Sequence, residues 1–288
     1  ELIARGWHVQ WVGNPQAMEG KLVPAHNIEL NTLVFAGFRG KGILQQLLIP
    51  LKLLCAFWTS IQILRRTRPN VVLGMGGYVA FPLGMMASLF NVPLVVHEQN
   101  SIAGLTNKVL AKLADRTLVA FPYALPTSHW VGNPVRIAVG QQPAPVTRFQ
   151  GRTGRLKVLV LGGSLGAQAL NEVIPKALAL MPESQRPELT HQSGEKNLQA
   201  LRDNYAKAGV SAETVAFIDD VATEMANADL VICRAGAMTV AEVACIGVAA
   251  LFVPFPHAVD DHQTHNAAFL VKENAGWIQQ QSVLTPEW

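Results

Sequence analysis

Two segments of the chain each combine a short apolar strand, a tight glycine turn and the beginning of a helix. They are residues 159–171 (LVLGGSLGAQALN) and residues 231–242 (VICRAGAMTVAE). Glycines let the backbone turn sharply and approach a ligand, and the unpaired N–H groups of a helix N-terminus favour an anion such as phosphate. One glycine turn alone is also consistent with a structural turn that binds nothing. The two together indicate a nucleotide with phosphates.

The second turn has two interpretations. Thr239 and Glu242 lie three residues apart, which is the spacing of a capping box with Thr239 as the N-cap. Alternatively, the Glu242 carboxylate accepts two hydrogen bonds from a ribose diol, as acidic residues do in nucleotide-binding α/β folds. The sequence leaves both open.

Short apolar runs alternate with helical patterns along the chain, which predicts βαβ units and parallel sheets. Residues 71–100 and 230–257 repeat one order of strand, glycine turn, helix and strand. With 288 residues and 50% hydrophobic content, the chain is long enough for two domains. We expect an α/β fold with domains at residues 1–136 and 137–288, and residues 140–154, rich in Gln, Pro and Gly, are typical of a linker.

Composition narrows the class of partner. A net charge of +3 is too weakly basic to predict nucleic-acid binding, and no arginine-aromatic module accompanies it. The three cysteines all lie in apolar runs, so we expect buried, reduced thiols rather than a disulfide framework. They are Cys55, Cys233 and Cys245.

A basic, amphipathic stretch lies between residues 38 and 70. Lys52, Pro50 and several glutamines interrupt its apolar run, which argues against a transmembrane span. It predicts either a helix packed on the core or a surface whose apolar side and cations contact an anionic membrane. The residues assigned to membrane contact are Ile43, Leu47, Leu48, Leu51, Trp58, Lys41 and Lys52.

Ten motifs occur in a fixed order: RGKG, GMGGYVAFP, HEQNSIAGLTNK, VGNPVR, GGSLGAQALN, HQSG, FIDD, CRAGAMTVAE, LFVPFPH and DDHQTHNA. Through them nearly the whole chain resembles the MurG family of peptidoglycan N-acetylglucosaminyltransferases. The resemblance implies a GT-B fold of two Rossmann-like domains with parallel sheets facing a cleft. It also implies transfer of N-acetylglucosamine from UDP-N-acetylglucosamine to lipid I, giving lipid II. The implied location is peripheral, at the cytoplasmic face of the plasma (inner) membrane, with cell-wall synthesis proteins as candidate partners.

The resemblance also assigns roles by position. It puts Arg136, Ser164, Ile218 and Gln263 around the donor, with backbone groups of Ile218 reading uracil. The turn that holds pyrophosphate and ribose comprises Ala237, Met238, Thr239, Val240, Ala241 and Glu242. Asn100 would reach the donor sugar from the N-terminal domain.

On the acceptor side the resemblance implies Tyr78, Glu98 and Asn100, one of which can assist proton transfer. Glu98 is the catalytic candidate within this chain. Each has a simpler alternative, since Tyr78 can serve packing alone and Glu98 can cap the helix that follows Ser101.

Some family features are missing or altered. The family's first glycine loop, of the type GGTGGH, carries a histidine that is a candidate general base, and it would precede Glu1. We therefore expect these 288 residues alone to lack turnover. Leu165 stands where some members have glutamine, and Val248-Ala249 replaces a commoner Leu-Pro or Val-Pro.

Residues 260–265 (DDHQTH) offer a metal site as an alternative. The resemblance instead explains this stretch through Gln263. The GT-B fold usually neutralises the departing diphosphate with dipoles and cations, so we expect no metal and no cofactor.

The implied reaction is a single displacement. The 4-hydroxyl of N-acetylmuramic acid attacks the anomeric carbon as UDP departs, with inversion; a base takes the proton and loop dipoles hold the diphosphate charge. Two alternatives stay open. One is a UDP-N-acetylglucosamine 2-epimerase, which would not need the basic amphipathic stretch; the other is a non-catalytic, membrane-docked fragment that binds UDP-sugar.

Overall fold

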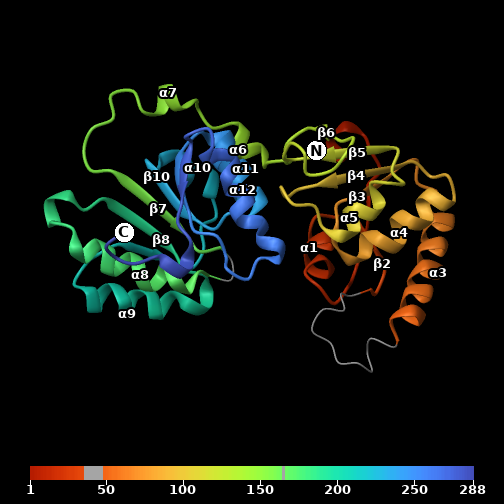
Figure 1. Ribbon diagram of the computed structural model, residues 1–288, viewed down its shortest axis with the longest axis horizontal. Coiled ribbons are helices and arrows are strands. Elements are labelled where there is room, and N and C mark those ends of the chain that lie inside the picture. Colours follow the sequence, from red (N-terminus) through yellow and green to blue (C-terminus); the bar gives the residue numbers. More distant parts are fainter. Residues whose placement is uncertain (36–47, 164–165) are drawn as a thin grey trace. The chain divides into compact units, whose positions relative to one another are not determined.

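The computed structural model describes residues 1–35, 48–163 and 166–288 (Figure 1). Ser164 and Leu165, together with Lys41, Ile43 and Leu47, lie outside the described residues. The chain forms two compact units. The first comprises Glu1–Gln99 and Ala103–Val131, and the second comprises Asn100–Ile102 and Gly132–Trp288. The division after Val131 is close to the boundary expected after Arg136, but Asn100 belongs to the second unit.

Within its described residues, the first unit contains two parallel sheets. β1 (Gln10–Gly13) pairs with β2 (Glu29–Thr32). The other sheet has the order β3 (Val72–Gly74), β4 (Leu94–Glu98), β5 (Arg116–Val119) and β6 (His129–Trp130). The described helical segments are η1 (Ile3–Arg5), α1 (Glu19–Ala25), α3 (Ile49–Thr67), α4 (Gly77–Leu89) and α5 (Leu105–Leu110).

The predicted strand, glycine turn, helix and strand are confirmed as β3, α4 and β4. Gly76 and Gly77 connect β3 to α4 with φ of +83° and +78°, a backbone region that glycine enters without steric cost. Side chains of these elements and of the neighbouring helices form one apolar core: Leu64, Val72, Met86, Ala87, Leu94, Val96 and Leu110.

Helix α3 presents two different faces. Ala56, Ser60, Ile63 and Leu64 are buried at helical spacing. On another face, Leu51, Leu54 and Trp58 are 60%, 63% and 60% exposed. We call these three residues the α3 apolar stripe. The expectation of a helix packed on the core is confirmed for α3, but through its other face, and the α3 apolar stripe takes no part in that packing. Among the described residues, no helix is both long and apolar enough to cross a membrane.

The second unit is built on a six-stranded parallel sheet. In spatial order its strands are β12 (Gly276–Ile278), β11 (Ala249–Phe252), β10 (Leu230–Cys233), β7 (Lys157–Leu161), β8 (Glu188–Gln192) and β9 (Glu213–Val215). From β7 the chain adds β8 and β9 on one side of the sheet. It then returns to β10, beside β7, and adds β11 and β12 on the other side. In α/β sheets of this kind, ligands bind where the order reverses, beyond the carboxyl ends of the strands.

Helices and short 3-10 turns connect these strands. They are α6 (Ile137–Gly140), α7 (Pro145–Arg148), α8 (Gln168–Leu180), η2 (Glu183–Gln185), η3 (Glu195–Asn197), α9 (Leu198–Ala208), α10 (Val221–Asn227), α11 (Ala237–Ile246), η4 (Val259–Asp261), α12 (His262–Val271) and η5 (Gln281–Val283). Val160, Leu170 and Leu201, from β7, α8 and α9, lie at the centre of a continuous apolar core and are fully buried.

Two expectations about local structure are wrong. Residues 140–154 are not a free linker, because Arg148 and Arg152 bind backbone carbonyls of the second unit. Cys55 and Cys245 are exposed, and only Cys233 is buried; all three are free thiols. Cys55 and Cys245 lie on the solvent-exposed faces of α3 and α11, so their apolar neighbours in the sequence do not bury them.

Candidate functional site

Both glycine turns lie at the reversal point of the second unit's sheet. β7 ends at Leu161 and β10 ends at Cys233, and these two residues are partners in the parallel ladder. The turn after each strand therefore emerges at the same edge, side by side. The two turns that the sequence analysis considers together are therefore neighbours in the fold, and their joint binding of a nucleotide stays a prediction.

The first turn has little space for side chains. Gly166 has a φ of +76°, and a Cβ on it would lie 2.3 Å from the backbone oxygen of Ser193. A Cβ on Gly162 would lie 2.8 Å from the carbonyl oxygen of Gln192. Gly163 has the same φ as Gly166, but crowding of an added methyl group is absent there, since, its chain neighbours aside, no atom of the part of the chain that the structure describes lies within 4 Å of its Cβ position. The turn thus needs glycine at Gly162 and Gly166 for close backbone packing.

Gln192, at the end of β8, holds this turn in place. Its Oε1 accepts a hydrogen bond from the Gly163 N–H at 3.0 Å, and its Nε2 donates to the Gly163 carbonyl at 3.2 Å. The same Nε2 also donates to the Ala216 carbonyl at 3.2 Å. One buried amide therefore connects the turn after β7 to the loop after β9, which contains Ile218.

The loop after β9 leads from Ile218 to α10. Among the described residues, no hydrogen-bond partner occupies the Ile218 N–H or C=O, so both backbone groups can take a ligand. Asp220 caps α10 by accepting a hydrogen bond from the Thr223 N–H at 3.0 Å. Hydrogen bonds from Thr223 hold the pKa of Asp220 below its ordinary value, and the charge of Arg136 contributes.

The second turn begins α11 differently from the capping-box interpretation, which is wrong. The N-cap is Gly236 and no side chain caps the helix. Thr239 lies inside the first turn, because the chain becomes helical at Ala237. The residues between Ala237 and Glu242 are all helical, including Met238, Val240 and Ala241. Within residues 1–35, 48–163 and 166–288, no side chain binds the first N–H groups of α11, which suits an anion.

Glu242 forms an ion pair with Arg136. The Arg136 Nε donates to Glu242 Oε1 at 2.9 Å, and the side chains are 52% and 12% exposed respectively. The residue that precedes α6 therefore orients the carboxylate on α11. The structure brings together two residues that the sequence places 106 positions apart.

Gln263, in α12, has its amide orientation fixed by two backbone donors. Its Oε1 accepts from the Ala235 N–H at 3.3 Å and from the Phe255 N–H at 2.9 Å. The carbonyl side thus secures the loops after β10 and β11. Among the described residues, no acceptor binds the Nε2 group, which leaves its two hydrogens for a ligand.

Asn266 is a residue that the sequence analysis missed, although it lies in the DDHQTHNA motif. It is fully buried. Its Oδ1 accepts from both the N–H and the hydroxyl of Ser101 at 2.8 Å, and its Nδ2 donates to Asn100 Oδ1 and to the Ala235 carbonyl at 3.2 Å. Asn266 therefore fixes the 100–102 segment on the second unit beside the loop after β10.

Tyr78 and Glu98 belong to the first unit. Tyr78 is half-exposed in the first turn of α4. Glu98 is only 3% exposed, and its Oε2 accepts from Asn107 Nδ2 at 2.8 Å and from the Gly104 N–H at 3.2 Å. Gly104 is the N-cap residue of α5, so Glu98 binds the backbone that leads into that helix. These bonds favour a positioning role over a proton-transfer role.

Among the described residues, no group of three or more His, Cys, Asp or Glu side chains is arranged to hold a metal ion. This includes the residues of the DDHQTH segment, where Asp261 Oδ1 instead accepts from the Thr264 hydroxyl at 2.7 Å.

Two family models match the chain. Residues 1–119 match the glycosyltransferase family 28 N-terminal domain, and residues 157–288 match the family 28 C-terminal domain. Among curated proteins, the UDP-N-acetylglucosamine–N-acetylmuramyl-(pentapeptide) pyrophosphoryl-undecaprenol N-acetylglucosamine transferase of Cupriavidus metallidurans is 64% identical over 282 residues, covering 98% of this chain and 79% of the relative. The protein of the same description from Ralstonia nicotianae is 59% identical, covering 99% and 79%.

Solved structures agree with these relatives. The crystal structure of Acinetobacter baumannii MurG is 38% identical, with a TM-score of 0.85 over 99% of this chain and 81% of that chain. The glycosyltransferase of kitacinnamycin, at 17% identity and a TM-score of 0.67, shares the fold. The two Rossmann-like units with parallel sheets confirm the expected GT-B fold class. The chain therefore belongs to glycosyltransferase family 28, among the MurG-type N-acetylglucosaminyltransferases.

Proposed function

We propose that this protein transfers N-acetylglucosamine from UDP-N-acetylglucosamine to the muramic acid 4-hydroxyl of lipid I, with inversion, to give lipid II in peptidoglycan synthesis. The observation that carries the proposal is the pair of glycine turns beyond the ladder partners Leu161 and Cys233, at the reversal point of the sheet. The named activity of the near-full-length relatives supports the same substrates.

The donor fits the second unit by chemistry. The vacant backbone groups of Ile218 match the polar edge of uracil, and the Glu242 carboxylate matches a ribose diol. The first turn of α11, Ala237 to Glu242, presents N–H groups and the positive end of a helix dipole to the pyrophosphate. The Gln263 Nε2 group supplies a further donor beside this turn.

Departure of UDP is the step that these groups assist. As the anomeric carbon bonds to the acceptor oxygen, its bond to the diphosphate oxygen breaks and negative charge grows on the diphosphate. Fixed dipoles that already point at that oxygen stabilise the transition state without reorganising.

The acceptor side is supported by Tyr78 and Asn100, whose polar groups suit a sugar. Glu98 remains a catalytic proposal only if its carboxylate leaves Asn107 and Gly104 when substrate binds. Its bonds to those groups support the alternative that it shapes the loop leading into α5.

We also propose that the first unit docks on the anionic cytoplasmic face of the plasma membrane. A polyprenyl-linked acceptor stays in the bilayer, so the enzyme must reach its surface. The α3 apolar stripe, with Leu48 and Lys52 exposed beside it, supports this proposal because apolar contact and charge reinforce each other there.

A transfer assay tests the function. The complete gene product is incubated with UDP-N-acetylglucosamine labelled in the sugar, with and without lipid I. We expect UDP release that depends on lipid I and label that appears in lipid II. An epimerase would release UDP or convert the sugar without lipid I, and a purely binding protein would hold UDP without turnover. Either result would overturn the proposal.

A further inference from the structure

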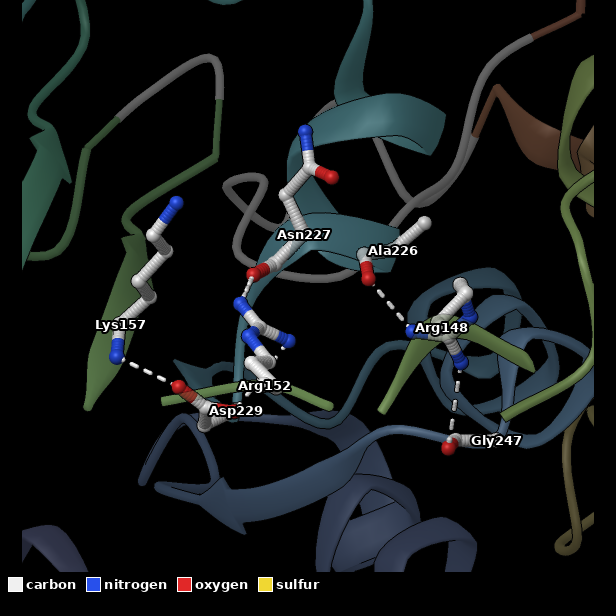
Figure 2. A network of polar contacts seen from close by, with 7 residues as sticks. All are labelled: Arg148, Arg152, Lys157, Ala226, Asn227, Asp229 and Gly247. Atoms are coloured by element: carbon white, nitrogen blue, oxygen red, sulfur yellow. Dashed lines mark hydrogen bonds and ion pairs between the residues drawn. The ribbon is translucent and has the colours of Figure 1, made fainter. Parts of the chain in front are cut away.

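Arg148 lies in the segment between α6 and β7, and it reaches the C-terminal ends of two helices at once (Figure 2). Its Nη1 donates to the carbonyl of Ala226 in α10, and its Nη2 donates to the carbonyl of Ile246, the last residue of α11, at 2.6 Å. The Gly247 carbonyl lies 3.5 Å from the same Nη2. A guanidinium suits this position, because its planar fork donates in several fixed directions and its charge complements the negative ends of helix dipoles.

The opposite ends of these two helices lead to the donor site of the proposed function. α10 follows the loop that contains Ile218, and α11 begins at the turn of Ala237 and carries Glu242. The two helices also pack against each other and against α6, which follows Arg136. The Arg148 side chain therefore connects α10 with α11. The first follows the loop that would bind the base, and the second begins at the turn that would bind ribose and pyrophosphate.

The Arg148 guanidinium is itself held in place. Its Nε donates to the Pro143 carbonyl at 2.8 Å, and its charge lies 5.1 Å from the centre of the Phe149 ring. The segment also contacts the end of α11 directly, since a Cβ on Gly247 would lie 2.7 Å from Pro145 Cγ. Rotation of the Arg148 side chain away from α11 would break its hydrogen bonds to Pro143, Ala226 and Ile246 together.

We propose that Arg148 is a positioning residue for the UDP-sugar donor: by bridging the C-terminal ends of α10 and α11, it sets the spacing of Ile218 and the first turn of α11. The proposal rests on the proposed function. Arg148 acts through the helices and does not touch the donor, so it is not a catalytic residue.

Arg152 provides a matched control from the same segment. Like Arg148, it lies near the Phe149 ring, with its guanidinium carbon 5.4 Å from the ring centre. It donates to the Asn227 carbonyl of α10 and pairs with Asp229 at 3.2 Å, but the structure gives it no bond to α11. Figure 2 shows Arg148 with Ala226 and Gly247, and Arg152 with Asn227 and Asp229. Removing the Arg152 side chain therefore weakens the attachment of the segment to α10. The bridge between α10 and α11 stays intact.

The experiment measures UDP affinity by calorimetry for the full chain and for Arg148→Met, Arg148→Lys and Arg152→Met. We expect Arg148→Met to raise the Kd for UDP between about 3-fold and 30-fold, the range for residues that couple to a site without contacting it. Arg148→Lys keeps the charge but loses the fork, so its Kd should fall between those of Arg148→Met and the parent. Arg152→Met should stay within about 2-fold of the parent. In the complete gene product, the KM for UDP-N-acetylglucosamine should rise in Arg148→Met while the KM for lipid I does not.

Several results would overturn the proposal. Unchanged UDP affinity in a folded Arg148→Met protein would do so, as would equal losses in Arg148→Met and Arg152→Met. If Arg148→Met does not fold, Arg148→Lys decides, and parent-like affinity in it counts against the bridge. A parent chain that fails to bind UDP removes the proposed function itself, and the inference with it.

Discussion

Arg136 donates from Nε to Oε1 of Glu242 at 2.9 Å, and this ion pair orients the carboxylate that α11 carries. Arg136 is half-exposed and Glu242 is mostly buried, so the pair faces solvent from its arginine side. A ribose diol that binds Glu242 would meet a carboxylate whose direction is already set. Preorganisation of this kind reduces the entropy lost on binding.

The first prediction is that Glu242→Ala weakens UDP binding by about 1.5–3 kcal/mol, the range for hydrogen bonds to a charged group. Glu242→Gln is the matched control, because it keeps the size of the side chain and one acceptor oxygen, and its loss should be smaller. Calorimetry on folded variants measures both. UDP affinity equal to the parent in Glu242→Ala would leave Glu242 only as the partner of Arg136.

The second prediction separates steric contact from backbone strain in the first glycine turn. Gly163 and Gly166 share a φ of +76°, but only Gly166 has backbone within 2.3 Å of its Cβ position. Gly163→Ala should therefore cost about 1–2 kcal/mol of stability from the left-handed backbone alone. Gly166→Ala should cost more and should also abolish UDP binding, because the turn must move away from Ser193.

Thermal unfolding and UDP calorimetry on the two alanine variants give the comparison. Equal stability losses in Gly163→Ala and Gly166→Ala would contradict the steric argument. Retained UDP affinity in Gly166→Ala would show that the turn tolerates the displacement.

The sequence predicts the alternating elements well, because their signals are local. The apolar run before the first glycine turn is the strand β7, and the turns at Gly76 and Gly236 both join a strand to a helix. The incorrect prediction of a capping box at Thr239 also has a local origin. Thr239 matches a capping box by spacing, but spacing cannot reveal that the N-cap lies three residues earlier, at Gly236.

The candidate site is less accessible to sequence reasoning, because its geometry depends on long-range contacts. Gln192 and Asn266 both lie in quoted motifs, but their roles follow from bonds to Gly163, Ala216 and Ser101 that no spacing predicts. Similarly, a stretch rich in Gln, Pro and Gly is typical of a linker. Only the carbonyl partners of Arg148 identify it as part of the second unit.

The third prediction concerns acid stability and His191. This side chain is fully buried in β8, where its Nδ1 lies 2.9 Å from the Tyr205 hydroxyl. Burial lowers the pKa of His191 from 6.5 to about 3. Below pH 6.5 the unfolded chain therefore binds a proton that the folded chain does not. The free energy of unfolding should fall by about 1.4 kcal/mol per pH unit from pH 6.5 toward pH 3, so roughly 2 kcal/mol is lost at pH 5.

Urea unfolding at several pH values measures this slope in the parent and in His191→Gln. The glutamine keeps a polar partner for Tyr205 but does not titrate, so stability between pH 6.5 and pH 4 should depend less on pH. The carboxylates and the remaining histidines contribute equally to the pH dependence of both proteins. The difference between the two slopes therefore isolates the contribution of His191. Identical slopes would contradict the buried, neutral state of this ring.

The fourth prediction concerns the membrane proposal. The triple variant Leu51→Ser, Leu54→Ser and Trp58→Ser removes the α3 apolar stripe, whose members are 60–63% exposed, so the fold should survive. We expect the parent to float with vesicles that contain anionic lipid, and the variant to stay in solution. Flotation of the parent should also weaken at high salt, because exposed charges about 10 Å or more apart are screened near 0.1 M salt.

The matched control removes two leucines and one tryptophan of similar exposure from the second unit: Leu156→Ser, Leu180→Ser and Trp277→Ser, at 66%, 60% and 58%. It loses as much exposed apolar surface but keeps the stripe, so it should float like the parent. If both triple variants lose flotation equally, general hydrophobicity and not α3 drives the binding. If the parent binds neutral and anionic vesicles equally well, the cations beside the stripe contribute nothing and the electrostatic half of the proposal fails.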